Sequence, residues 1–181
     1  AAIDPWRPLG TVQDSELLAI LENTRPRMQR SAENGGHVRD MAVYVIIGPP
    51  GSGKTTALVN SGLHFPLAAQ LGAGAVRGVG GTRNCDWWFT DQAVLLDTAG
   101  RYTTQDSDAT VDKAAWLGFL GLLKKQRARR PIDGAFIAIS LSDLLLGSDA
   151  ERAAHAAAIR QRIQELYTQL GVRFPIYLML T

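Results

Sequence analysis

Short apolar runs alternate with longer amphipathic stretches from Met41 to the end of the chain. The runs have strand length and are rich in β-branched residues, as expected for strands buried on both faces of a sheet. They cover residues 42–47 (AVYVII), 93–98 (AVLLDT), 135–141 (AFIAISL) and 174–180 (FPIYLML). Residues 85–90 (CDWWFT) stand two positions before the second run, which predicts a hairpin of adjacent strands.

Helical periodicity appears between these runs, at residues 55–62, 113–130 and 148–171. The second helix would place Trp116, Leu120 and Leu123 on one face. The third has capping-box spacing at its start and a glycine at its end. This alternation predicts an α/β fold with a mostly parallel sheet covered on both faces, and ligands bound at the carboxyl ends of the strands.

The first 40 residues have a different pattern, with three prolines and one amphipathic segment at residues 15–25. We expect an N-terminal helix and linker at 1–40, followed by one domain at 41–181. The chain starts without methionine or a signal-peptide pattern and stops inside an apolar run. We therefore expect both ends to be cut from a longer protein.

Composition supports one folded domain and excludes several classes of function. The chain has 181 residues, 46% of them apolar, and a formal net charge of +2, so nothing indicates a nucleic-acid partner. Its single cysteine, Cys85, cannot form an internal disulfide and is expected to be a buried structural thiol. The most apolar stretch is interrupted by Asp143 and is too short to span a membrane. The histidines have no metal-ligand spacing.

Residues 48–55, GPPGSGKT, fit the phosphate-loop pattern G-x-x-x-x-G-K-[ST] between a predicted strand and a predicted helix. Glycines let successive backbone N–H groups point at phosphate oxygens, Lys54 would reach the β- and γ-phosphates, and the Thr55 hydroxyl would bind Mg²⁺. The alternative is a glycine-rich turn that binds nothing. The predicted cofactor-binding residues here are Gly48, Pro49, Pro50, Gly51, Ser52, Gly53, Lys54, Thr55 and Thr56.

A second candidate site follows the strand at 93–98. In the D-x-x-G turn, the Asp97 carboxylate would hold the Mg²⁺ shell and the Gly100 N–H would bond the γ-phosphate. Thr82, in the glycine-rich segment between the two motifs, is the candidate switch threonine that covers Mg²⁺. The alternative for Thr82 is a loop hydroxyl with no ligand role.

Arg101 stands where many nucleotide switches have a glutamine that orients the attacking water. Arginine cannot accept a hydrogen bond from that water, so slow turnover is expected. Three roles stay open for it: an arginine finger in cis, a salt bridge with an acid such as Asp106, or a surface side chain. Gln105 is the candidate for a water-orienting amide in the same loop.

Two further features have open interpretations. Trp87 and Trp88 are neighbours on a predicted strand and therefore face opposite sides of the sheet; one is expected in the core, and the other covers a helix or contacts a partner. The basic run at 124–130 is either a solvated helix end or a patch that meets anionic lipid.

The order strand, phosphate loop, helix, switch, hairpin and D-x-x-G resembles the small-GTPase arrangement. Signal-recognition GTPases are similar in GKTT and DTAGR, but they lack the hairpin and place more chain between the motifs. A closer resemblance runs from Met41 to Thr181. The blocks GPPGSGKTTALVNSGLHFPLA, GGTRNCDWWF, DTAGRYTTQDS, AAWLGFLGLL and ERAAHAAAIR resemble the cytoplasmic domain of the IcmF/TssM family of bacterial type VI secretion.

This resemblance implies a P-loop NTPase, a GTPase-like three-layer sandwich on the cytoplasmic face of the bacterial inner membrane. It implies binding of ATP or GTP with Mg²⁺, and membrane attachment through segments outside this chain. Expected partners are a second inner-membrane protein, an outer-membrane lipoprotein and baseplate components. Thr181 would be the first letter of a T-K-x-D base-recognition motif, so the domain is expected to be C-terminally truncated. The preference for adenine or guanine therefore stays open.

Two functional hypotheses follow. The first is a nucleotide-binding switch domain that hydrolyses slowly and is read by partner proteins. The alternative is a non-hydrolysing structural docking domain with a P-loop fold.

Overall fold

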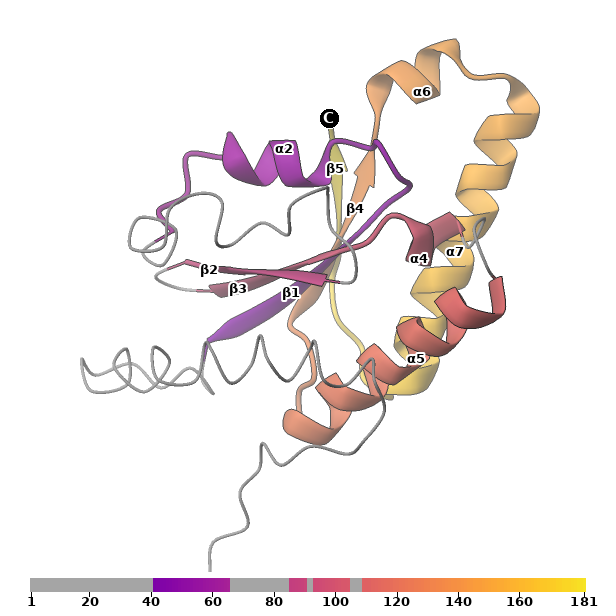
Figure 1. The fold of residues 1–181 in the computed structure, drawn as a ribbon. Coiled ribbons are helices and arrows are strands. Elements are labelled where there is room, and N and C mark those ends of the chain that lie inside the picture. Colours follow the sequence, from indigo (N-terminus) through magenta and orange to yellow (C-terminus); the bar gives the residue numbers. More distant parts are fainter. Residues whose placement is uncertain (1–40, 66–84, 91–92, 105–108) are drawn as a thin grey trace, which may run out of the picture. The chain divides into compact units, whose positions relative to one another are not determined.

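The computed structural model describes residues 41–65, 85–90, 93–104 and 109–181 (Figure 1). The chain divides into two compact units, Ala1–Met41 and Ala42–Thr181. All helices and strands given below belong to the second unit. The helix predicted at 15–25 and its linker lie outside the described residues.

A five-stranded mixed sheet forms the centre of this unit, in the order β2-β3-β1-β4-β5. β1 pairs in parallel with β3 and β4, and β4 pairs in parallel with β5, whereas β2 and β3 are antiparallel. The predictions of an α/β fold, a mostly parallel sheet and a hairpin before residue 98 are therefore confirmed. The strands are β1 Ala42–Ile47, β2 Cys85–Phe89, β3 Ala93–Thr98, β4 Gly134–Ile139 and β5 Ile176–Leu180.

Helices flank the sheet, with α2 on one side and α5 and α7 packed together on the other (Figure 1). On the α2 side, Leu58 packs in a buried cluster with Ile46, Trp88 and Leu95. On the other side the α5 face predicted from the sequence is buried, with Trp116 fully inaccessible. The helices are α2 Lys54–Val59, α4 Arg101–Thr104, α5 Ala109–Gln126, α6 Leu141–Leu146 and α7 Asp149–Leu170. Within the described residues no helix is long and apolar enough to cross a membrane.

The predicted helix at 113–130 ends earlier than expected, at Gln126, so the last arginines of the basic run lie beyond it. Beyond the helix, the Asp133 carboxylate pairs with two of the arginines of this run. It lies 3.4 Å from Arg127 Nη1 and 2.6 Å from Arg130 Nε, and it accepts a 2.7 Å hydrogen bond from Val43 N. Part of the basic run is thus paired within the fold.

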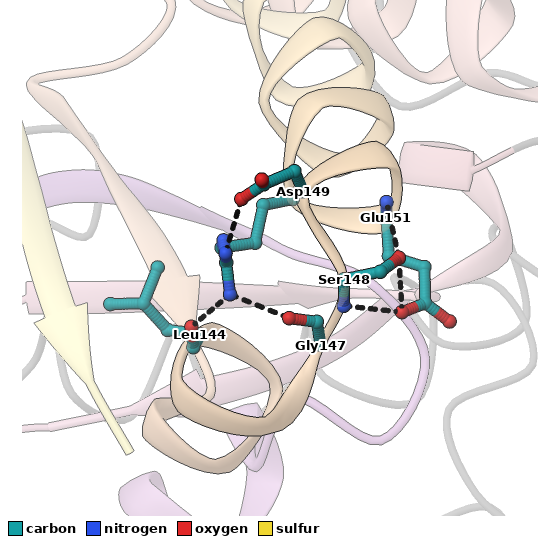
Figure 2. Close-up of polar contacts among 6 residues, drawn as sticks. Leu144, Gly147, Ser148, Asp149 and Glu151 are labelled. Carbon is teal, nitrogen blue, oxygen red and sulfur yellow. Dashed lines mark hydrogen bonds and ion pairs between the residues drawn. The ribbon is translucent and has the colours of Figure 1, made fainter.

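The strand predicted to reach residue 141 also ends early, at Ile139. Ser140 caps a short helix, α6, by accepting a 3.2 Å hydrogen bond from Asp143 N. α7 then starts with the predicted capping box between Ser148 and Glu151 (Figure 2). It ends at Gly171, whose φ of 70° is the left-handed conformation that glycine adopts readily.

Candidate functional site

The loop at residues 48–53, here called the glycine loop, joins the carboxyl end of β1 to α2. Gly51 and Gly53 have φ values of 75° and 73°, so side chains at these positions would be strained. A Cβ at Gly48 would lie 2.8 Å from both Ala138 O and Ser52 Oγ. Glycine is therefore required in the loop for conformation at two positions and for space at a third.

Lys54 opens α2 and turns its side chain back into the glycine loop, where it is buried. Its Nζ donates to Gly48 O at 2.9 Å, to Pro49 O at 3.0 Å and to Ser52 Oγ at 3.4 Å. Burial lowers the pKa of Lys54, and the Asp97 carboxylate opposes that effect. The hydrogen bonds of the ammonium group thus stabilise the curved conformation of the glycine loop.

Thr55 and Asp97 meet although they are far apart in sequence. The Thr55 hydroxyl donates to Asp97 Oδ2 at 2.5 Å. β1 and β3 are parallel neighbours with Ile46 opposite Asp97, so Asp97 lies at the carboxyl edge of the sheet. The glycine loop starts at the same edge and leads from β1 to Thr55 in α2. The structure therefore brings together two of the three residues predicted to hold Mg²⁺; Thr82, the third, lies outside the described residues.

The D-x-x-G turn packs directly on the glycine loop. A Cβ at Gly100 would lie 2.5 Å from Pro50 Cα and 2.9 Å from Pro49 C, so only glycine permits this approach. The α4 helix follows at once, and its Thr103 hydroxyl accepts a 3.1 Å hydrogen bond from Gly48 N. The D-x-x-G turn and α4 thus each contact the glycine loop.

Arg101 forms an ion pair, one of its three predicted roles, but with a different acid from the one that the sequence suggested. Its Nε lies 3.1 Å from Asp112 Oδ1 on α5, and its guanidinium carbon lies 5.2 Å from the centre of the Tyr102 ring. Burial raises the pKa of Tyr102, while Arg101 acts in the opposite direction. Of the three roles open for Arg101, this geometry favours the salt bridge. Asp106 and Gln105 lie outside the described residues.

The remaining predicted loop residues differ in exposure. Ser52 and Pro49 are buried, whereas Pro50, Gly51 and Thr56 are exposed. The last three therefore face the solvent side of the loop and of α2.

Two contacts to the glycine loop were missed by the sequence reasoning. Thr103 showed no signal, because its bond to Gly48 spans 55 positions of the chain. Thr181, interpreted as the start of a base-recognition motif, donates its hydroxyl to Ser52 O at 2.8 Å. The sequence drew attention to Thr181 only as part of that motif. Its hydrogen bond to the glycine loop appears only in the structure.

Cys85 and the paired tryptophans lie on β2, which pairs with the strand that carries Asp97. Cys85 is buried, as predicted, and burial, with smaller effects of Asp97 and Asp86, raises the pKa of its thiol well above the ordinary value. Trp88 is in the core, with its ring 5.1 Å from that of Phe65. Trp87 is half-buried on the opposite face of the sheet, consistent with the prediction that the two tryptophans diverge.

Comparison with known proteins identifies the family to which the chain belongs. Residues 109–181 match the IcmF-related N-terminal domain family. The chain is also 75% identical to a type VI secretion system component, TssM1, of Pseudomonas aeruginosa, over 95% of this chain. The chain belongs to the IcmF/TssM family. It spans 16% of the length of that relative.

Proposed function

We propose that residues 41–181 form a P-loop NTPase domain with a GTPase-like fold, which binds ATP or GTP with Mg²⁺ and acts as a switch within a type VI secretion complex. The observation that carries this proposal is the convergence of Lys54, Thr55 and Asp97 at one edge of the sheet. A hydroxyl at 2.5 Å from a carboxylate, beside a buried ammonium group, has the chemistry of a Mg²⁺-phosphate site.

The side chains present fit these ligands. The described residues contain no cluster of three carboxylate, imidazole or thiol groups that could hold a metal alone. Mg²⁺ does not need one, because it commonly takes one or two protein oxygens and completes its shell with water and substrate phosphates. Thr55 and Asp97 would supply those two oxygens.

Lys54 would bind phosphate by exchanging its present acceptors. Its three hydrogen bonds go to neutral oxygens of the glycine loop. Phosphate oxygens are stronger acceptors for an ammonium group than neutral carbonyls. Bound Mg²⁺ would neutralise charge on the phosphates, while the loop backbone and Lys54 would orient them. Gly100, in contact with the same loop, would report the presence of the γ-phosphate through its N–H.

Slow hydrolysis follows from the surroundings of Arg101. The side chain next to the D-x-x-G turn is engaged by Asp112 and offers hydrogen-bond donors only. It therefore cannot accept a proton from an attacking water. Turnover would depend on positioning by the loop and Mg²⁺, with Gln105 as the candidate for orienting the water.

The setting of the domain is part of the same proposal and is supported by its relative, which is a component of a type VI secretion system. We place it on the cytoplasmic face of the bacterial inner membrane, attached through segments outside this chain. Its partners there would be a second inner-membrane protein, an outer-membrane lipoprotein and baseplate components.

The test is Mg²⁺-dependent phosphate release from ATP and from GTP by a chain extended past Thr181. Lys54→Ala removes the buried ammonium group, and Lys125→Ala, at an exposed lysine of α5, is the matched control. We expect release by the wild type and by Lys125→Ala, and its loss in Lys54→Ala. If all three folded proteins release phosphate equally, the hydrolase role is wrong. If, in addition, none binds nucleotide, the alternative of a docking domain replaces the switch.

A further inference from the structure

Arg162 is an arginine in the middle of α7 that is almost completely buried, at 1% exposure. Its Nη2 lies 3.0 Å from Glu165 Oε1 on the same helix, and its Nη1 donates to Tyr102 O at 3.1 Å. Burial lowers the pKa of Arg162, although a guanidinium stays charged at any ordinary pH. A buried charge is tolerated only where it is paired and hydrogen-bonded, so these two acceptors define its position.

The acceptor on Tyr102 belongs to α4, the four-residue helix that starts directly after Gly100. A helix this short cannot satisfy its own last carbonyl groups. Arg162 supplies a donor from another helix to one of them. The next residue, Thr103, accepts the hydrogen bond from Gly48 N. Two consecutive residues of α4 therefore bond to α7 and to the glycine loop.

We propose that Arg162 is a positioning residue that fixes α4 against α7 and transmits the nucleotide state of the D-x-x-G turn to that helix. The coupling part of this inference rests on the proposed function; the anchoring part does not. Displacement of Gly100 moves Tyr102, which is two residues away. If Arg162 stayed in place, it would be left with a buried donor that water does not reach, which is unfavourable. Arg162 therefore follows Tyr102 O and shifts α7 with it.

The variants are chosen so that the fold survives. Arg162→Lys keeps a charge beside Glu165 but loses the planar fork that spans two acceptors. The double variant Arg162→Met with Glu165→Gln removes both charges, so that neither is left buried and unpaired. Arg160→Gln is the matched control, because Arg160 is exposed on the same helix.

The first measurement is amide hydrogen exchange in the absence of nucleotide, on a chain extended past Thr181. Exchange in α4 is expected to accelerate about tenfold in both Arg162 variants and to stay at the wild-type rate in Arg160→Gln. Unchanged exchange in both Arg162 variants overturns the anchoring role. The result of this measurement does not depend on whether the protein binds nucleotide.

The second measurement adds Mg²⁺ with ATP or GTP. In the wild type, protection is expected both at residues 48–55 and in α7. In the Arg162 variants, protection at 48–55 remains, KM stays within about threefold of wild type, and kcat falls about tenfold. Wild-type protection of the loop without any change in α7 overturns the coupling. If the loop itself shows no protection, the nucleotide function fails and the coupling fails with it, while the first measurement still decides the anchoring role.

Discussion

Replacing Thr103 by valine tests the contact between α4 and the glycine loop with little change in shape. The Thr103 side chain is 2% exposed, and its hydroxyl oxygen is the acceptor for Gly48 N at 3.1 Å. Valine has nearly the same volume, so the variant removes the acceptor without opening a cavity. Gly48 N–H is then left buried with its acceptor gone.

The expected loss follows from the burial of the hydrogen bond. Thr103 is 2% exposed, and in valine a methyl group takes the place of the hydroxyl, so no room is left for a water molecule to replace it. Leaving a buried N–H unsatisfied costs about 1–3 kcal/mol of stability. We expect Thr103→Val to lower the free energy of unfolding by about 2 kcal/mol, and Tm by about 4–8 °C for a chain of this size.

The assay is urea unfolding followed by circular dichroism, with Thr168→Val as control. Thr168 is exposed on α7, and its hydroxyl donates to Gln164 O of its own helix at 2.7 Å. Its loss should change stability by less than about 0.5 kcal/mol. The urea midpoint should fall in Thr103→Val at an unchanged m-value, because the variant and the wild type expose the same surface area on unfolding. Equal effects of the two substitutions would refute the claim that this bond is buried and irreplaceable.

Two further predictions concern the neighbourhood of the site. Because burial raises the pKa of the Cys85 thiol well above its ordinary value in the native state, the unfolded chain loses that proton first. Stability should therefore fall as pH rises above the ordinary thiol pKa of about 8.5. Cys85→Ala should flatten this fall in urea midpoints, and parallel curves for the two proteins would contradict the cause. Gly100→Ala places a Cβ 2.5 Å from Pro50 Cα and should cost at least about 2 kcal/mol. Gly118→Ala, where a Cβ meets open space within α5, should instead stabilise by about 0.5–1 kcal/mol, so equal thermal shifts would exclude the steric cause.

Features that depend on a few neighbouring residues were predictable from the sequence. The glycine loop is one, because its glycines and Lys54 follow one another in the chain and their conformations are local. The α7 boundaries are another, since the capping box and Gly171 satisfy the ends of the same helix. The hairpin of β2 and β3 follows from two strand-like runs that only two residues separate in the sequence.

Features that depend on packing between distant segments were not predictable. Helix α6 was missed because its leucines resemble the end of a buried strand, and only the Ser140 cap separates the two. The sequence suggested Asp106 as an acid for Arg101, whereas the structure pairs it with Asp112 on α5. Periodicity indicates which face of α5 is buried, but it does not indicate which charged residue lies opposite.

The sequence by itself determined the α/β class, the order of the strands with the helices α2, α5 and α7 between them, and the residues of the glycine loop. These properties follow from hydrophobic periodicity and from the backbone freedom of glycine, and both are local. Only the tertiary structure decided that Thr103 and Thr181 bind the loop and that Arg162 holds α4. Each of these bonds joins residues at least 55 positions apart, and it is the packing of the sheet and its helices that brings such residues together.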